Sequence, residues 1–572
     1  MRCIVFTLLF ALLTACEPAE LRSIAGEGGV LGPPEADPDC SGDPDADGDG
    51  IPDEREGRDD LDGDGIPNRE DEDSDGDGLL DRDEAGPDPC NPISSDADGE
   101  PDFLDVDSDD DGLTDDREVE LGTDPGDQDS DDDGVSDLGE VEGTGTDPND
   151  PTEGLRPGDF FVVLPYEGPR ENRSLVFGTD IAIADVFFLV DMTGSMQGER
   201  TNLIGGLLDV VIPGIEGAID DVHFGVGGMD DYPYAAEGRT PYGDPRDLPF
   251  YLLRDIGPPD ADVGRWSLEA GPERCPNDVT DGSDQGIGTI EGMPNGTPDI
   301  LEAVEGLPCH FGADFPESYV PALYATASGE GLSWPMGSIP ARVCPPTGPD
   351  TDGSFTGYPC FRPGALPIVL LFGDAPFHDG PGGSNAYSFD SPSFDEAVAA
   401  LNGIGARVVP IFSGGAEGQA DYRAIATATG SVDVDDEPLF FQIASDGSGL
   451  DTTVVEAVRD LVGGTPQDVS TRTENVPGNP DDVDATRFIE RIVPLGGFPV
   501  AGFERFDESA FYRVIPGTQV EFGVDFYNGV RPPTDKAEIF EARIVVVGNG
   551  VADLDSRNVY VVVPPEGTII LI

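Results

Sequence analysis

Apolar and polar positions follow two different periods along this chain, and the change of period divides it into regions. Between residues 181 and 465, short apolar runs alternate with segments in which apolar positions recur every three or four residues. Such alternation predicts buried strands separated by amphipathic helices, and therefore a doubly wound α/β domain. The expected strands are 186–190, 223–226, 368–372, 408–412 and 439–443, and the expected helices are 202–219, 297–307, 319–327, 394–404, 422–429 and 453–462.

The C-terminal region, 468–572, has a different pattern. Its runs at 520–526, 542–547 and 558–563 are rich in β-branched and aromatic residues and are separated by Gly and Pro. This pattern predicts a β-sandwich of immunoglobulin-like size. Two further strand-like runs, 160–164 and 174–177, lie in the segment 155–180 that precedes the α/β domain.

The N-terminal segment has the composition of a secretory signal, with Arg2 followed by an apolar run too short to span a bilayer. Leu13-Thr14-Ala15-Cys16 resembles the lipobox of bacterial lipoproteins, which implies a signal peptide at 1–15 and lipidation of Cys16. The alternative is an ordinary signal peptide with a chance cysteine. Residues 16–39 are rich in Gly, Pro, Ala and Glu and are expected to form a flexible tether. We therefore expect an extracytoplasmic, lipid-anchored protein at a bacterial outer membrane or cell surface.

The charge of the chain excludes one class of partner. The chain of 572 residues carries a formal net charge of −87, with 117 Asp and Glu against 30 Lys and Arg. Nucleic-acid binding requires a basic face, so a nucleic-acid partner is excluded. The acidic residues are concentrated in the segment 40–153.

Within 40–153 an internal repeat carries Asp or Glu at fixed positions of a twelve-residue frame, with Gly at position six. Oxygen ligands at positions one, three, five, nine and twelve are the pattern of a calcium loop. The five frames place these residues at Asp45, Asp47, Asp49, Asp53, Glu56; Asp60, Asp62, Asp64, Asn68, Asp71; Asp73, Asp75, Asp77, Asp81, Glu84; Asp107, Asp109, Asp111, Asp115, Glu118; and Asp129, Asp131, Asp133, Asp137, Glu140. A partial copy lies between Asp96 and Asp105.

The frames lack the long helices that flank an EF-hand, and they resemble thrombospondin type 3 repeats. The alternative is a disordered acidic segment, in which a regular glycine at position six is not expected. Few apolar side chains are present, so Ca²⁺ is expected to supply most of the folding free energy. Cys40 and Cys90 bracket the first three frames, and a disulfide between them is expected in an oxidising compartment.

The strongest candidate site follows the first strand of the α/β domain, at Asp191-Met192-Thr193-Gly194-Ser195. Ligands of open α/β sheets bind at the carboxyl ends of the strands. One carboxylate and two hydroxyls at alternate positions suit a hard divalent cation.

Asp191-x-Thr193-x-Ser195 resembles the metal-ion-dependent adhesion site of von Willebrand factor type A domains. The segments 224–233, 313–317 and 370–375 are similar, in the same order, to segments of the integrin β-subunit branch of that family. The resemblance implies that Thr193, Ser195 and Glu317 contact a Mg²⁺ or Mn²⁺ ion, and that Asp191 and Asp374 bind it directly or through water.

The same resemblance implies a second cation at Asp231, Asp314 and Glu317, although Gly312 replaces an expected asparagine. Gly198-Glu199 replaces two expected aspartates at a third, regulatory site, so that regulation is not expected. Integrin β subunits also have a β-sandwich that the metal-binding domain interrupts. The strands of 155–180 either begin such a sandwich or form a simple N-terminal extension of the α/β domain.

The resemblance implies that the open coordination position of the cation takes an exposed Asp or Glu of a protein ligand. The long intervals 234–295 and 329–363 are loops at which specificity is expected. Four cysteines lie in or beside them and allow three pairings, of which Cys275 with Cys309 and Cys344 with Cys360 is the favoured one.

Two other functions remain as alternatives to this adhesion protein on a calcium-stabilised stalk. One is a calcium-stiffened structural spacer that binds no ligand. The other is a phosphatase of the haloacid dehalogenase type, because Asp191 and Asp374 each follow an apolar strand. That family requires a second aspartate where Thr193 stands, and His223, His310 and His378 show no metal-ligand spacing, so catalysis is not expected.

Overall fold

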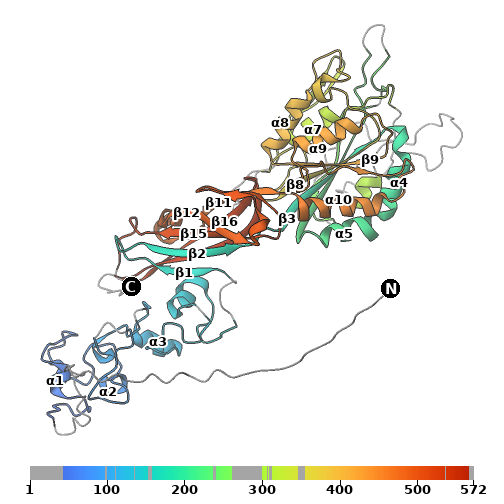
Figure 1. Ribbon diagram of the computed structural model, residues 1–572. Helices are drawn as coiled ribbons and strands as arrows, with labels where there is room; N and C mark the ends of the chain where they lie inside the picture. Colours follow the sequence, from blue (N-terminus) through green and yellow to red (C-terminus); the bar gives the residue numbers. More distant parts are fainter. Residues whose placement is uncertain are drawn as a thin grey trace, which may run out of the picture. The chain divides into compact units, whose positions relative to one another are not determined.

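The computed structural model describes residues 43–565 except 97–99, 110, 134, 153–157, 236–239, 246, 260–298, 306, 308–311, 345–354 and 535 (Figure 1). The chain divides into two compact units. The first comprises the chain up to Asp109 together with Thr114–Glu120, and the second comprises Asp110–Leu113 and the chain from Leu121 onward. No helix among the described residues has the length and apolar character that crossing a membrane would require.

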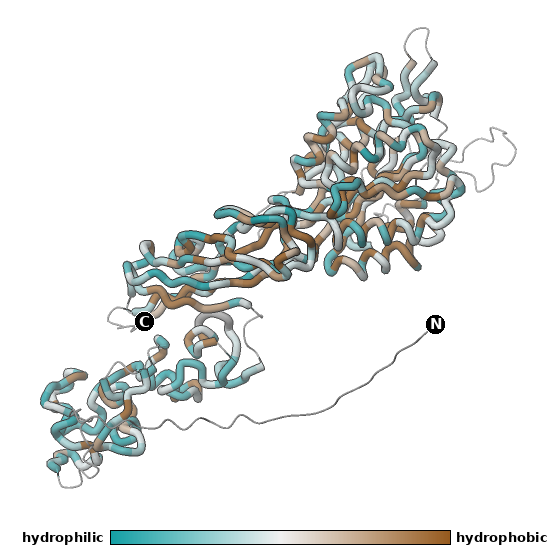
Figure 2. The backbone as a smooth tube through the Cα atoms, viewed as in Figure 1, coloured by the Kyte–Doolittle hydropathy of each residue, from teal (hydrophilic) through white to brown (hydrophobic). Residues whose placement is uncertain are grey.

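The first unit consists of loops joined by short helices. The helices α1 Asp53–Glu56 and α2 Asp81–Glu84 have four residues each, and α3 begins at Asp115 and ends at Leu121. The hydrophobic core of this unit consists of Ile51, Ala85 and Phe103, with Leu104 packed against it. Figure 2 shows the same contrast, because this unit is mostly hydrophilic and the centre of the second unit is not.

The α/β region, 181–465, contains a six-stranded sheet in the order β10-β9-β8-β3-β4-β5. All neighbouring strands are parallel except β4 and β5. The strands are β3 Ile183–Asp191, β4 Asp221–Met229, β5 Tyr251–Gly257, β8 Leu366–Gly373, β9 Arg407–Phe412 and β10 Phe441–Gln442. The multidomain α/β fold predicted from the sequence is therefore confirmed.

Helices cover both faces of this sheet. The side chains of the central strand β3 point alternately to the two faces and so contribute to two hydrophobic cores. Val186, Phe188 and Val190 enter one core, and Phe187 and Leu189 enter the other. The first core also holds α4 Gln197–Gly206, α5 Ile212–Glu216, α6 Ile300–Glu305 and α10 Leu450–Gly464. The second holds α7 Tyr319–Ser328, α8 Phe394–Gly403 and α9 Gln419–Ala428 (Figure 1).

Several details of the α/β region differ from the sequence prediction. The helix expected at 202–219 is divided into α4, a π-helical turn at Leu207–Val211 and α5, because glycines and Pro213 weaken the regular ladder. The strand expected at 439–443 is only Phe441–Gln442. The interval 234–295 was expected to be a loop, but it contains β5, which pairs with the edge of the sheet.

Nine further strands of the second unit form two sheets, which we call the two-sheet region. One sheet has the order β1-β17-β16-β11-β14-β13 and the other β12-β15-β2. The strands are β1 Phe160–Val163, β2 Glu171–Phe177, β11 Gln467–Asn475, β12 Ile489–Phe498, β13 Arg505–Phe506, β14 Phe511–Val514, β15 Gln519–Phe526, β16 Glu538–Gly548 and β17 Ala552–Val563.

Aromatic side chains connect these two sheets. The Phe160 and Phe526 rings lie 5.8 Å apart between centroids, and those of Phe511 and Phe522 lie 5.3 Å apart. The strands β1 and β2 precede the α/β region in the sequence, yet they pair with β17 and β15. Each of the two sheets therefore contains strands from before and from after the α/β region in the sequence, and the interpretation of 155–180 as the start of a β-sandwich stays a prediction.

A hairpin and a disulfide lie in the interval 329–363. The hairpin pairs β6 Leu332–Trp334 with β7 Gly337–Ile339. The expected disulfide between Cys344 and Cys360 is present. Cys16, Cys40, Cys275 and Cys309 lie outside the described residues, so their expected lipidation and pairings remain predictions.

Candidate metal site

The loop after β3 holds its polar residues at the carboxyl edge of the sheet. The backbone NH of Met192 donates to Met229 O at 2.8 Å, which holds the loop beside the end of β4. A single 3-10 turn, Gly194–Met196, then leads into α4. Because β3, β4 and β8 are parallel, the residues that follow all three strands meet at this edge.

Asp191 is fully buried at the centre of this edge. Its Oδ1 accepts hydrogen bonds from the Thr193 backbone NH at 2.9 Å and from Thr193 Oγ1 at 2.7 Å. Thr193 Oγ1 lies 3.3 Å from Ser195 Oγ. Burial and the nearby charge of Asp374 raise the pKa of Asp191 to about 7.

Tyr319 connects the two aspartates of the site. Its hydroxyl donates to Asp191 Oδ2 and accepts from the backbone NH groups of Asp374 at 3.3 Å and Ala375 at 3.4 Å. A side chain at Gly373 would collide with this hydroxyl and with that of Tyr422, so the strand must end in glycine here. The sequence prediction missed Tyr319, because nothing in its local pattern distinguishes it from a core residue at the start of a helix.

Asp374 follows β8 and makes a hydrogen bond with Ser195. Burial raises the pKa of Asp374, and the bond with Ser195 opposes that effect. Two carboxylates and two hydroxyls of the predicted set therefore lie at one edge, linked by hydrogen bonds.

Glu317 reaches the site from a separate loop. Its backbone NH donates to Pro376 O at 3.0 Å, and its carbonyl accepts from the His378 NH at 2.9 Å. The side chain is buried, and its Oε2 has no hydrogen-bond partner among the described residues. A Cβ at Gly312 would lie 2.8 Å from Glu317 Oε1 and 3.3 Å from Thr193 Cγ2, so these two side chains flank Gly312.

Among the described residues, no Arg or Lys side chain forms an ion pair with Asp191, Glu317 or Asp374. Burial, followed by the charges of Asp191 and Asp231, raises the pKa of Glu317 well above its usual range. Buried carboxylates without partners are costly unless they bind a cation or a proton. The donor set of carboxylate and hydroxyl oxygens therefore fits a hard divalent cation such as Mg²⁺ or Mn²⁺.

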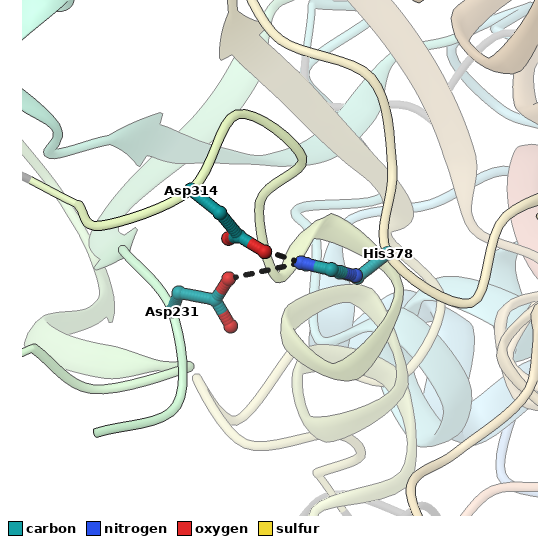
Figure 3. Close-up of side chains that lie close together, drawn as sticks. All are labelled: Asp231, Asp314 and His378. Atoms are coloured by element: carbon teal, nitrogen blue, oxygen red, sulfur yellow. Dashed lines mark hydrogen bonds and ion pairs between the residues drawn. The ribbon is translucent and has the colours of Figure 1, made fainter. Parts of the chain in front are cut away.

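A second cluster consists of Asp231, Asp314 and His378 (Figure 3). His378 Nε2 lies 3.3 Å from Asp231 Oδ2 and 3.3 Å from Asp314 Oδ1. Burial lowers the pKa of His378, but its contacts with the two carboxylates outweigh burial and raise that pKa to about 10. The family resemblance grouped Asp231 with Asp314, whereas His378 was set aside because the histidines show no metal-ligand spacing along the sequence.

The repeat loops of the first unit share a local geometry. Their position-six glycines have positive φ angles of 108° at Gly50, 99° at Gly65 and 102° at Gly78, with no atom within 4 Å of an added Cβ. Glycine is therefore needed for the backbone conformation and not for space. In each of these loops the position-five aspartate accepts the NH of residue seven at 2.7 Å.

Several repeat carboxylates use one oxygen for the loop and leave the other buried without a hydrogen-bond partner among the described residues. This holds at positions three and five of three loops, namely for Oδ2 of Asp47, Asp49, Asp75, Asp77, Asp131 and Asp133. Both carboxylate oxygens of Glu56 and Glu84, at position twelve, are also buried without such a partner. Such inward-facing oxygens fit a loop that encloses Ca²⁺.

Position nine also holds the loop together, and its predicted part in calcium binding stays a prediction. Ser74 donates both its NH and its hydroxyl to the two carboxylate oxygens of Asp81, at 2.7 Å and 2.6 Å. Ser130 and Asp137 repeat this arrangement. In these loops the position-nine carboxylate closes the turn through the residue at position two.

The same closure identifies the partial repeat as a sixth loop. Ser95 donates its NH and hydroxyl to Asp102 at 2.7 Å and 2.9 Å, and the Asp102 NH donates to Ile93 O at 3.0 Å. The Asp81 NH makes the matching bond to Glu72 O at 3.1 Å. The centre of the sixth loop, residues 97–99, lies outside the described part of the chain.

No protein-family model matches this sequence, and no curated protein matches it. Its fold is similar to that of a von Willebrand factor type A protein from Catenulispora acidiphila, with 13% identity, 71% of this chain and 72% of that chain covered, and a TM-score of 0.27. It is also similar to the open conformation of the pilus adhesin SpaC from Lactobacillus rhamnosus GG, with 11% identity, 69% and 45% covered, and a TM-score of 0.26. Scores this low transfer no function from either protein to this chain.

Proposed function

We propose that this chain is an adhesion protein that binds a carboxylate of a protein ligand through a divalent cation. The cation is Mg²⁺ or Mn²⁺, held by Thr193, Ser195 and Glu317, with Asp191 and Asp374 as direct or water-bridged ligands. The observation that carries the proposal is the group of buried acids at the carboxyl edge of the sheet, whose Glu317 Oε2 has no hydrogen-bond partner among the described residues. A cation supplies the positive charge that these residues lack.

An open coordination position of the cation accepts an Asp or Glu of the partner. The resulting bond is between an anion and a metal ion, so it forms only when the metal is bound. The net charge of −87 disfavours long-range attraction of an acidic ligand. Specificity therefore depends on close contacts made by the loops around the edge.

The proposal also assigns roles to the repeat loops and to Cys16. The repeat loops bind Ca²⁺ through the inward-facing carboxylate oxygens, and Cys16 carries a lipid that tethers the chain to a bacterial membrane. In this arrangement the repeats act as a stalk at the cell surface. The alternative is that the chain is a calcium-stiffened spacer whose α/β region binds no ligand. We propose no catalytic role, because Thr193 occupies the position that the phosphatase resemblance requires to be aspartate.

The test is Mn²⁺ binding by the full chain in saturating Ca²⁺, followed by electron paramagnetic resonance. Wild type is compared with the Asp191→Ala, Ser195→Ala double variant and with Asp395→Asn, which alters an exposed acid at the start of α8. We expect one Mn²⁺ that resists displacement by Ca²⁺ in wild type and Asp395→Asn, and its loss in a double variant whose circular dichroism is unchanged. Equal binding by all three proteins would favour the spacer.

A further inference from the structure

We propose that Asp231, Asp314 and His378 form a second metal site that takes Zn²⁺ and not Ca²⁺. The site is separate from the cation proposed at Asp191, and it adds a histidine that the sequence prediction did not assign to any ligand set. The metal would lie between His378 Nε2 and the two carboxylates that face it (Figure 3).

The spacing of the three side chains fits one bound cation. Nε2 lies 3.3 Å from each of the facing oxygens, which is long for a hydrogen bond to a charged group. Two ligand atoms of a tetrahedral Zn²⁺, each bound at about 2.0–2.1 Å, lie roughly 3.3 Å apart. The two distances from Nε2 therefore match the separation that a zinc ion imposes, and all three ligand atoms lie within 4.8 Å of one another.

Neighbouring groups orient both buried ligands before any metal binds. His378 Nδ1 contacts the carbonyl oxygen of Asn385, which makes Nδ1 a donor, so Nε2 is the nitrogen that faces the carboxylates and that a metal would bind in place of its proton. Tyr387 stacks on the imidazole at 4.3 Å between ring centroids, and Tyr242 packs against it edge to face at 5.2 Å. A zinc-binding histidine usually has such an outer partner on its second nitrogen.

Asp231 supplies an independent indication of a ligand. Its Oδ1 accepts from the Tyr232 NH at 2.6 Å, from Ser318 Oγ at 2.8 Å and from the Tyr387 hydroxyl. Its Oδ2 is buried and lies 3.3 Å from His378 Nε2, with no other hydrogen-bond partner among the described residues. One oxygen is thus fixed by the protein and the other remains available to a metal.

The donor set favours Zn²⁺ over Ca²⁺. Calcium prefers six to eight oxygen ligands, whereas an imidazole nitrogen with carboxylates suits Zn²⁺ and related transition metals. The His378 and Asp231 side chains are 4% and 0% exposed, and that of Asp314 is 26% exposed. Asp314 therefore marks the side from which an ion enters.

The test uses the full chain in saturating Ca²⁺ and Mg²⁺, with Zn²⁺ as the added probe. Zn²⁺ is measured by elemental analysis after dialysis and by X-ray absorption at the zinc edge. We expect one tightly bound Zn²⁺ with nitrogen and oxygen neighbours at about 2.0–2.1 Å and the scattering pattern of an imidazole. His378→Gln should weaken Zn²⁺ binding by at least about 100-fold, since changes in the outer sphere of a metal site already cost 10–100-fold.

Two variants separate this site from other histidines and from the adhesion cation. His223→Gln alters a histidine at the start of β4 and should bind Zn²⁺ as wild type does. The Asp191→Ala, Ser195→Ala variant should also retain Zn²⁺, so a failure of the adhesion site and a failure of this one are distinguishable.

Equal Zn²⁺ binding by wild type and a folded His378→Gln variant, or no Zn²⁺ in wild type, would overturn the proposal. In the second case a protonated His378 alone balances the two carboxylates. If His378→Gln does not fold, Asp314→Asn replaces a partly exposed ligand and should lower Zn²⁺ affinity, and the absorption spectrum of wild type tests the imidazole directly.

Discussion

The first unit and the carboxyl edge of the α/β sheet both bring carboxylates close together, but the two groups of carboxylates are held in place by different means. At the sheet edge, Asp191 and Asp374 follow strands whose side chains fill two hydrophobic cores. In the first unit, the hydrophobic core among the described residues consists of Ile51, Ala85 and Phe103, so its loops carry little hydrophobic stabilisation of their own. A metal site built on a sheet is formed before the metal binds, whereas a site built from loops depends on the metal for its fold.

Removal of Ca²⁺ should have the largest effect of the changes considered, and it should affect only one of the two regions. We expect chelation to expand the segment 43–120 and expose it to proteases, because its carboxylates repel one another and its core is small. The sheet of the α/β region should remain folded. Small-angle scattering measures the expansion, and mapping of the cleavage sites locates it. Scattering curves that superimpose with and without Ca²⁺ would contradict the dependence on metal.

Acidification should partly replace Ca²⁺ in the repeats. Burial, reinforced by neighbouring aspartates, raises the pKa of Glu56 and Glu84 to about 9. The pKa of Asp75 is raised to about 8 by burial, which hydrogen bonding opposes and like charges reinforce. Folded-state pKa values above the usual values of about 4 mean that the folded form binds these protons more tightly.

The metal-free fold is therefore most stable below about pH 4, and that stabilisation is lost as the pH rises toward 9. With Ca²⁺ present the pH dependence of stability reverses, because protons compete with the cation for the same oxygens. Scattering over this pH range in chelator and in Ca²⁺ measures both trends. A radius that does not change with pH in chelator would rule out this account.

A smaller effect is expected from Gly373→Ala at the end of β8. The added methyl group would meet the hydroxyls of Tyr319 and Tyr422, so we expect a loss of about 1–3 kcal/mol in the free energy of unfolding. Gly205→Ala, in α4, has open space around its Cβ and should be neutral or stabilising by up to about 1 kcal/mol. Thermal unfolding in Ca²⁺ compares the two variants, and equal stability would show that the edge tolerates the methyl group.

The smallest effect should follow Tyr319→Phe, which removes the hydroxyl between Asp191 and the backbone of Asp374. We expect Mn²⁺ affinity to fall by about tenfold, because groups that orient metal ligands typically contribute 10–100-fold. Tyr324→Phe removes a hydroxyl from the same helix that donates to Glu330, and should leave Mn²⁺ affinity unchanged. Unchanged affinity in Tyr319→Phe would mean that Asp191 needs no support from Tyr319.

Residue spacing alone predicted those parts of the sites that lie close together in the chain, and only the family resemblance added the distant residues Glu317 and Asp374. Asp191, Thr193 and Ser195 are neighbours, and the position-six glycines recur in a fixed frame. Tyr319 and His378 were missed because their roles arise only when distant loops meet at the sheet edge. The serine at position two of the repeats was within reach, since Ser74 and Ser130 occupy the same position relative to Asp81 and Asp137.

Strand pairing explains most of what could not be predicted about the fold. The edge strand β5 lies in a segment rich in Gly and Pro, and only its antiparallel pairing with β4 makes it a strand. The partners of β1 and β2 are more than 300 residues away, as in the pairing of Phe160 with Val559 and of Phe177 with Val520. Periodicity identifies a strand but contains no information on which distant strand will be its neighbour.

The pairing of β2 with β15 and of β11 with β16 also has a mechanical consequence. In the sequence the α/β region is inserted between β2 and β11, and these two strands belong to different sheets. Tension applied at the carboxyl edge of the α/β sheet is therefore divided between two covalent connections. Each connection ends in a strand that is bonded to neighbours within its own sheet, so the load is shared across the two-sheet region.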